Sequence, residues 1–294
     1  MKFRFAKKTD REDVLKFCTN TFAWGDYLDQ VWDLWFTESD GALIVAEDES
    51  SDNNKRSAIA VSHISFCPNR KIIWLEGIRV NPDYRRRSIA TELLNEMLSY
   101  GKRQGAKEAS AIVAVNNIPS QLMMKKNGFS VISKWDYYSI VQTHEFGKVN
   151  ARIANANDIE MVWQYLNKSH IYKSSGKRYV KSWRWYSFDR NTLSNIIKDE
   201  KLLIAGEDVI EGIAVINKCG YWNKSNIFEV VYLDALSFPS VYDLIGLVMM
   251  LVHSAYDRYQ RIQIFSPQSK ELSSVMKRLY VNNSEQFLLY KKMI

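Results

Sequence analysis

The residues best suited to chemistry form a strand–loop–helix segment that contains three consecutive arginines. A β-branched strand ends at Val80, Pro82 stops it, and an amphipathic helix begins at Ser88 or Ile89. The first N–H groups of a helix lack intrahelical partners, and the helix dipole favours an anion beside them. Arginine side chains suit phosphate oxygens. This pattern predicts a diphosphate site formed by Arg85, Arg86, Arg87, Ser88, Ile89, Ala90 and Thr91.

A single acid lies in the middle of the apolar strand that leads into this loop. Glu76 is costly to bury unless it is paired or used, which makes it a candidate proton acceptor. Strand alternation predicts that Glu76, Ile78 and Val80 share one face. The alternative is a structural partnership between Glu76 and a neighbouring Arg or Lys. On the adjacent strand, His63 is either a proton relay or a hydrogen-bonded histidine without a catalytic role.

The elements that must position these residues are strands and helices in alternation. Strands are predicted over residues 57–66, 71–80, 210–218 and 227–236, and helices over residues 89–104 and 242–259. A turn at Asn69 joins the first two strands as a hairpin. This pattern indicates an α/β protein of the α+β kind, in which helices flank a mixed sheet.

The chain also repeats itself. Arg4, Ala6, Asp10 and Val14 recur at an offset of 148, as Arg152, Ala154, Asp158 and Val162. Four later segments recur in the same order, the last of them being 74–78 and 232–236. Such a repeat predicts two copies of one fold. We place the domains at residues 1–148 and 149–294.

The second copy lacks the phosphate loop. Its corresponding segment, residues 237–244, contains no arginine and has Asp243 where phosphates would lie. We therefore expect the second domain to bind no diphosphate and to form a wall that covers the acceptor cleft of the first. The alternative is that it only stabilises the first domain.

The loop resembles that of the Gcn5-related N-acetyltransferases (GNAT family). These enzymes carry Arg/Gln-x-x-Gly-x-Gly/Ala after a strand that ends in Val-x-Pro. Here Arg85-x-x-Ser88-x-Ala90 follows Val80-x-Pro82, and Leu93-Leu94 comes one turn later. The stretch from Asn117 to Phe129 resembles the family's Asn-x-x-Ala-x-x-Leu-Tyr-x-Lys-x-Gly-Phe. Two positions depart from the pattern, with Ser88 in place of Gly and Met124 in place of the Tyr that commonly protonates the departing thiolate.

The resemblance implies a tandem GNAT-like fold, acetyl-CoA as co-substrate and direct transfer to an amine. It implies that a strand amide near Ile78 contacts the oxyanion and that Asn117 lies along the pantetheine arm. It also favours Glu76 as the general base. The acid is left among Tyr84, Tyr137, Tyr138 and water, and we take Tyr138. The remaining implied cofactor contacts are Arg79, Val80, Ser120 and Met124.

For the acceptor, residues 24–32 fall in the family's first helix–loop–helix, which lines the acceptor side. Asp26 could hold a cationic group and Tyr27 could pack on it, with His63 nearby on the sheet. This stretch is loosely similar to two-domain animal histidine N-acetyltransferases. Packing of its Trp residues in the core would explain the same pattern. We expect the acceptor to be a primary amine of a small molecule, an amino acid or a peptide.

The composition limits which other classes of protein the chain could belong to. The 294 residues carry a formal charge of +7, three cysteines and four histidines, without metal-ligand spacing or a membrane-length apolar run. We expect free thiols in the cytoplasm, no metal and no membrane, and the oligomeric state stays open. One rival interpretation is a non-catalytic acyl-CoA sensor, supported by Met124 and Ser88. A nucleic-acid partner rests only on charge and aromatic content, and we do not expect it.

Overall fold

The computed structural model describes residues 1–22, 25–48, 57–68, 70–140, 147–217, 226–235, 237–255, 259, 261–278 and 283–294. The sequence-based statements about Trp24, Asn69, Cys219 and Leu236 fall outside these residues. The chain forms two compact units. Unit 1 contains Met1–Ile112, Pro119–Ser130 and Tyr290–Ile294, and unit 2 contains Val113–Ile118 and Val131–Leu289.

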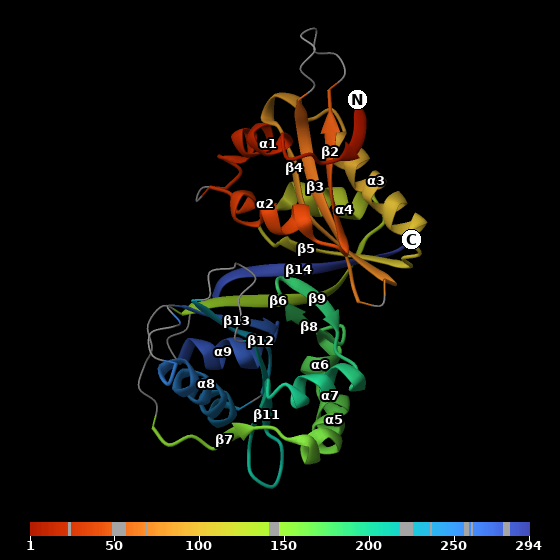
Figure 1. The fold of residues 1–294 in the computed structure, drawn as a ribbon. Helices are drawn as coiled ribbons and strands as arrows, with labels where there is room; N and C mark the ends of the chain where they lie inside the picture. The colour runs from red at the N-terminus through yellow and green to blue at the C-terminus, as the bar shows by residue number, and fades with distance from the viewer. Residues whose placement is uncertain are drawn as a thin grey trace. The chain divides into compact units, whose positions relative to one another are not determined.

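Unit 1 is built on a sheet with the strand order β1-β2-β3-β4-β5 (Figure 1). The first four strands are antiparallel, and β4 and β5 are parallel. Its elements are β1 (Lys2–Phe5), α1 (Asp10–Cys18), α2 (Leu28–Thr37), β2 (Gly41–Glu47), β3 (Ala58–Phe66), β4 (Ile72–Val80), the 3-10 turn η1 (Pro82–Tyr84), α3 (Ile89–Arg103), β5 (Glu108–Ala114) and α4 (Ile118–Lys126).

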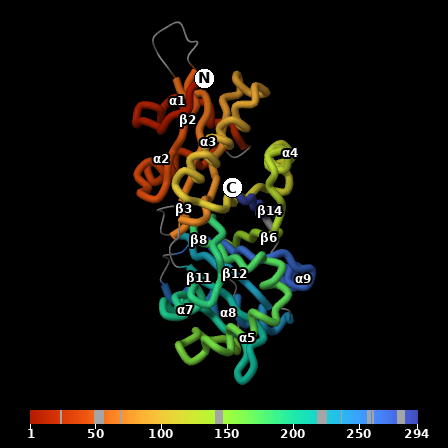
Figure 2. The backbone as a smooth tube through the Cα atoms, turned by 90° about the vertical axis from the view of Figure 1, so that its right-hand side faces the viewer, coloured from red at the N-terminus to blue at the C-terminus, as the bar shows by residue number. Residues whose placement is uncertain are grey.

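Both faces of this sheet are covered, because all nine residues of β3 are buried. Helices α1 and α3 both pack on β3, and α1 and α2 lie on one side of the strands with α3 on the other (Figures 1 and 2). Helix α3 buries Ile89, Leu93, Leu94, Met97, Leu98 and Gly101, which follow the helical period. The predicted helix over 89–104 is confirmed to within one residue.

Unit 2 has the strand order β14-β6-β13-β12-β11-β10-β7. Helices α8 and α9 lie on one side of its strands, and α5, α6 and α7 lie on the other (Figure 1). Its elements are β6 (Ser130–Ile140), β7 (Ala151–Ile153), η2 (Ala156–Asp158), α5 (Ile159–Lys168), α6 (His170–Ser174), the hairpin β8 (Arg178–Lys181) and β9 (Arg184–Ser187), α7 (Arg190–Lys198), β10 (Leu202–Ala205), β11 (Gly212–Asn217), β12 (Ile227–Ala235), α8 (Phe238–His253), β13 (Arg261–Pro267), α9 (Lys270–Arg278) and β14 (Asn283–Met293).

The sequence repeat has a matching structure in each unit. In unit 1, Arg4 donates to both carboxylate oxygens of Asp10 at 2.7 and 2.8 Å, and in unit 2 Arg152 does the same to Asp158 at 2.7 Å each. In both units the carboxylate also accepts the N–H three residues before it. The repeated pair fixes the first strand to the helix that follows it.

Two strands contribute to the compact unit formed mainly by the other half of the sequence. Strand β6 comes from the first half of the sequence, but nearly all of it lies in unit 2, where it pairs with β13. The end of β14 lies in unit 1, where Ile294 donates its N–H to the Lys107 carbonyl at 3.0 Å and Lys291 pairs with Glu108 at 2.6 Å. The compact units are therefore not two uninterrupted stretches of sequence.

Helix α8 begins earlier than its apolar pattern predicts, at Phe238 instead of residue 242. The Ser237 side chain accepts the N–H of Ser240 and caps the helix, and Pro239 suits a first-turn position. Within the described residues, no helix is both long and apolar enough to cross a membrane.

Candidate functional site

A β-bulge in β4 determines which residues face each other. Val61 pairs with Arg79 and His63 pairs with Glu76, so Ser62 alone lies opposite both Gly77 and Ile78. Side chains of paired residues lie on the same face. The expected alternation is therefore wrong, because the extra residue moves Ile78 and Val80 to the other face and brings Arg79 onto the face of Glu76.

Gly77 makes the bulge possible. Its φ of +69° is one that L side chains rarely adopt, and a Cβ there would lie 2.6 Å from the Trp35 ring. We expect Gly77→Ala to lower the free energy of unfolding by about 2 kcal/mol or more, from backbone strain plus the clash. Gly105→Ala is the matched control, since Gly105 has a φ of +91° and open space around its Cβ position. Equal losses in urea unfolding would rule out the clash with Trp35.

Glu76 is hydrogen-bonded to a histidine of the neighbouring strand. His63 is fully buried, and its Nδ1 lies 2.9 Å from Glu76 Oε1. Its Nε2 lies 3.4 Å from Oε2 of Glu38, and the ring stacks on Trp35 with centroids 4.7 Å apart and planes at 3°. The other Glu38 oxygen accepts the Ser65 hydroxyl at 2.7 Å. These residues come from β3, β4 and the end of α2.

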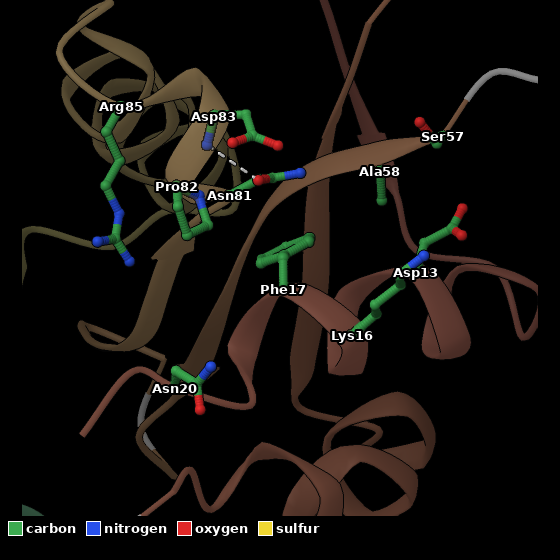
Figure 3. A pocket seen from close by; sticks show the side chains of 10 residues that line it. All are labelled: Asp13, Lys16, Phe17, Asn20, Ser57, Ala58, Asn81, Pro82, Asp83 and Arg85. Carbon is green, nitrogen blue, oxygen red and sulfur yellow. Dashed lines mark hydrogen bonds between the residues drawn. The ribbon is translucent and has the colours of Figure 1, made fainter. Parts of the chain in front are cut away.

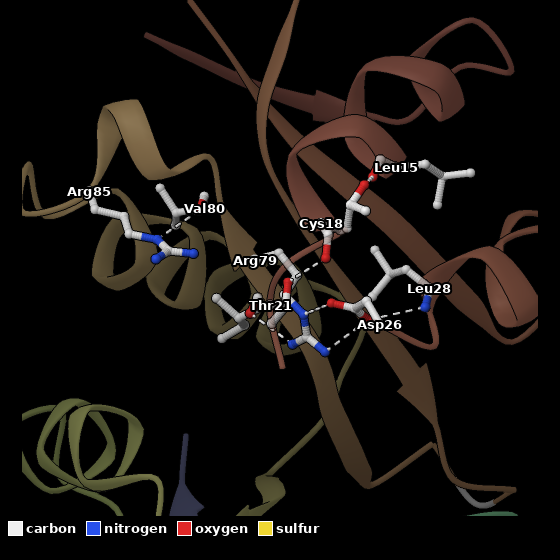
Figure 4. Close-up of polar contacts among 10 residues, drawn as sticks. Leu15, Cys18, Thr21, Asp26, Leu28, Arg79, Val80 and Arg85 are labelled. Carbon is white, nitrogen blue, oxygen red and sulfur yellow. Dashed lines mark hydrogen bonds and ion pairs between the residues drawn. The ribbon is translucent and has the colours of Figure 1, made fainter. Parts of the chain in front are cut away.

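Beside this cluster, Asp26 binds Arg79 of its own chain (Figure 4). The Arg79 Nε donates to Asp26 at 2.7 Å, and both side chains are nearly buried. Asp26 also accepts the Leu28 N–H at the start of α2. Burial opposes the charge of Arg79, but Tyr27 and Asp26 outweigh it and raise its pKa. Arg79 thus anchors the α1–α2 loop and lies away from the three loop arginines.

Tyr27 closes the same cluster. The Arg79 guanidinium lies over its ring at 5.2 Å, and the ring meets Trp35 edge to face. Burial raises the pKa of the Tyr27 hydroxyl, Arg79 opposes the rise, and the Glu76 carboxylate adds to it. The structure therefore brings together Asp26, Tyr27, His63, Glu76 and Arg79.

The predicted diphosphate loop is exposed and leads directly into α3. Arg85, Arg86, Arg87 and Ser88 are all exposed. Arg85 donates to the Val80 carbonyl at 3.2 Å (Figure 4), and Arg87 lies over the Tyr84 ring at 5.1 Å. Ser88 is the N-cap of α3 and makes no side-chain cap hydrogen bond. The N–H groups of Ile89, Ala90 and Thr91 are in the first turn, where an anion can bind them.

Ser88 has a left-handed backbone with a φ of +62°. Its backbone is therefore strained, unlike that of a residue with ordinary φ and ψ angles. Glycine adopts this conformation without the strain that a Cβ brings. We expect Ser88→Gly to raise the free energy of unfolding by up to about 1 kcal/mol. Coenzyme A affinity, measured by calorimetry, should stay unchanged or increase. A large loss of affinity would show that the Ser88 side chain itself contacts the ligand.

Strands β4 and β5 separate at the level of the bulge. Their paired residues run from Ile72 with Glu108 to Trp74 with Ser110, and β4 continues to Val80. Beyond Trp74, the edge of β4 that faces β5 is outside this ladder, and it includes the main chain of Ile78. The exposed arginines and the first-turn N–H groups of α3 fit a diphosphate.

A pocket of about 450 Å³ adjoins the loop on the α1 side (Figure 3). Phe17 forms its floor, and Lys16 and Arg85 contribute positive charge. Asp13 and Asp83 contribute negative charge, so the pocket has no single sign.

The other predicted residues lie elsewhere. Tyr138 is in the hydrophobic core of unit 2 with 1% exposure, and burial together with Asp136 raises its pKa to about 12. This environment does not support a role as the acid. Met124 is buried in α4, Ser120 lies one turn earlier, and Asn117 is in the turn after β5.

Cysteine chemistry has no support at this site. Cys18 is a free, buried thiol and Cys67 is also buried, and burial raises the pKa of the Cys18 thiol to about 12. Sequence reasoning missed Glu38, which follows α2 and meets His63 only in the folded chain. An acid next to Ser39 and Asp40 looks like an ordinary exposed turn, so no local pattern distinguishes it.

The fold of the whole chain is that of tandem GNAT proteins. A GCN5-related N-acetyltransferase from Sphaerobacter thermophilus matches it with a TM-score of 0.64 at 12% identity, over 99% of this chain and 95% of that one. A tandem GNAT protein from the clavulanic acid biosynthesis pathway matches with a TM-score of 0.55 at 10% identity, over 99% and 98% of the two chains.

In sequence, residues 11–129 match the model of the acetyltransferase (GNAT) family. This segment is therefore similar in sequence to that family. The aminoglycoside N(6')-acetyltransferase type 1 of Salmonella typhimurium is 26% identical over 82 residues, which is 28% of this chain and 57% of that protein. The chain thus spans little more than half the length of this curated relative.

Proposed function

We propose that this protein transfers an acetyl group directly from acetyl-CoA to a primary amine. The observation that carries the proposal is the bulged strand β4, which has the Glu76 carboxylate beside the bulge and the Ile78 main chain at the edge that has left β5. A carboxylate and a main-chain amide at this point are what amine acylation needs. The exposed arginine loop at the start of α3 supports diphosphate binding close by.

In the proposed reaction the neutral amine attacks the thioester carbonyl. A C–N bond forms, and the Ile78 N–H donates to the oxyanion. Glu76 accepts the proton that the amine loses. The C–S bond then breaks, and the thiolate takes a proton from water, because Met124 cannot donate one. In this reaction His63 donates to Oε1 of Glu76 and holds the carboxylate in place.

For the acceptor we propose an amine of a small molecule, an amino acid or a peptide. Support comes from the curated relative, which is named for an aminoglycoside, a small molecule with several amines. We further propose residues 1–148 and 149–294 as the two copies of the fold. A reducing compartment such as the cytoplasm agrees with the buried free thiol of Cys18.

The second copy is proposed to bind no coenzyme A. Its helix start is capped by Ser237, and the Ser240 hydroxyl there donates to the Glu211 carboxylate at 3.2 Å. A carboxylate repels phosphate at the place where unit 1 offers free amides. We expect calorimetric titration with coenzyme A to give one site per chain. Two equivalent sites would contradict this assignment.

A non-catalytic acyl-CoA sensor is the second candidate, and Met124 at the place of the family's acid favours it. Turnover of acetyl-CoA with a panel of amines separates the two functions. Release of free thiol that depends on the amine supports the transferase. Tight coenzyme A binding without any turnover across the panel supports the sensor.

A further inference from the structure

We propose that Glu38 is a positioning residue for Glu76 and acts on it through His63. This inference rests on the proposed function, in which Glu76 is the general base. Glu38, His63 and Glu76 form a line of side chains on one face of the sheet, and we call this line the Glu–His–Glu triad. Glu38 touches neither the thioester nor the amine in the proposed reaction.

The geometry of the triad fixes the orientation of the imidazole ring. His63 Nδ1 faces Glu76 at 2.9 Å and Nε2 faces Glu38 at 3.4 Å. Turning the ring over would exchange each nitrogen with a carbon, so both carboxylates would then face C–H groups. Only the observed orientation directs a ring nitrogen toward each of Glu76 and Glu38, and it is the one that lets Nδ1–H donate to Glu76.

The contact between His63 and Glu38 is close but is not a formed hydrogen bond. Within the described residues, Nε2 is buried without an acceptor in hydrogen-bond geometry. A buried N–H left unsatisfied costs about 1–3 kcal/mol, so a ring protonated at Nε2 gains by moving toward the nearby carboxylate. Glu38 is itself held by the Ser65 hydroxyl, and its side chain is 19% exposed against 0% for His63.

The surroundings leave the ring little other freedom. Trp35 stacks on one face of the imidazole. A Cβ at Gly41 would lie 2.8 Å from His63 Nε2 and 3.2 Å from the carboxyl carbon of Glu38. The absent side chain of Gly41 therefore makes room for these two groups to meet. The nearby Arg79 guanidinium is bound to the Asp26 carboxylate, which balances its charge.

The test combines kinetics with the state of the ring. Glu38→Gln removes the negative charge at nearly constant volume. We expect kcat/KM to fall about tenfold, as for outer-shell partners of metal-bound histidines, with coenzyme A affinity unchanged. If Glu38 acts through Glu76, the double variant Glu38→Gln/Glu76→Gln should be no slower than Glu76→Gln alone. Glu96→Gln, in an exposed pair with Arg103, is the matched control.

The second measurement is the 15N spectrum of the histidine rings. The chain has only four histidines, and His63→Gln assigns the signal of His63. We expect Glu38→Gln to shift the His63 Nε2 resonance, and Gly41→Ala to shift it in a protein that keeps all three members of the triad. Normal turnover in Glu38→Gln, losses that multiply with Glu76→Gln, or an unchanged ring spectrum would each overturn the proposal.

The two levels of the proposal fail in different ways. Absence of turnover with every amine refutes the transferase function, whereas the ring spectrum is read on the folded protein without any substrate. Should turnover be normal in Glu76→Gln, Glu76 is not the base, and a loss in Glu38→Gln would then have to act by another route.

Discussion

Glu76→Gln should lose about 100- to 10,000-fold in kcat, which is the usual contribution of a positioned general base. The amide keeps the size of the side chain and can still accept from His63, but it cannot take the amine proton. Coenzyme A affinity should stay nearly intact, because the diphosphate loop begins after the bulge. The loss should shrink as pH rises, since more of the acceptor amine is then already neutral.

A structural role for Glu76 predicts a different set of results. The melting temperature and the coenzyme A affinity would then fall together, with turnover reduced only in proportion. A folded Glu76→Gln protein with near-normal turnover at neutral pH would show that Glu76 is not the base. Steady-state rates over a range of pH, together with calorimetric titration of each variant, distinguish these outcomes.

Asp26→Asn should destabilise the protein by about 3–5 kcal/mol, because it leaves the Arg79 guanidinium buried without its counter-charge. The side chains of Arg79 and Asp26 are 13% and 5% exposed. The α1–α2 loop would lose its anchor on β4, and the hydrogen bond from the Leu28 N–H at the start of α2 would be disturbed with it. Urea unfolding followed by circular dichroism measures the loss.

Two controls separate burial from charge in this experiment. The Arg70–Asp40 pair has the same 2.7 Å separation but lies at the surface, so Asp40→Asn should cost about 1 kcal/mol or less. Replacing both buried partners by apolar residues, as Asp26→Leu with Arg79→Met, should restore much of the lost stability. If Asp26→Asn is as mild as Asp40→Asn, the buried pair is not the anchor of the loop.

Local patterns in the sequence predict the parts of the site that depend on residues close to one another along the chain. The helix that starts at Ile89 follows from Pro82, the apolar period and the small residues, and the structure has it there. Ser88 shows the limit of such reasoning. Its residue type is visible in the sequence, but its left-handed φ is decided by the path of the loop.

The bulge at Gly77 and the partners of Glu76 lie beyond local patterns. One extra residue in β4 moves each later side chain of the strand to the opposite face of the sheet. Simple strand alternation therefore assigns Arg79 to the wrong face. Asp26 could be read as a site for a substrate cation because its actual partner, Arg79, is 53 residues away. Glu38 lies 25 residues before His63 in sequence, and only tertiary packing joins them.

Because strands are exchanged between the halves, the order in which the chain is synthesised determines when unit 1 can be completed. Unit 1 includes Tyr290–Ile294, which are translated about 160 residues after Ser130. At about 5–20 residues per second this is a delay of roughly 8–32 s. During that time β5 lacks the end of β14, and its edge resembles the unpaired edges that recruit other chains. We therefore expect a nascent chain of this protein to bind a chaperone before it can bind an acyl donor.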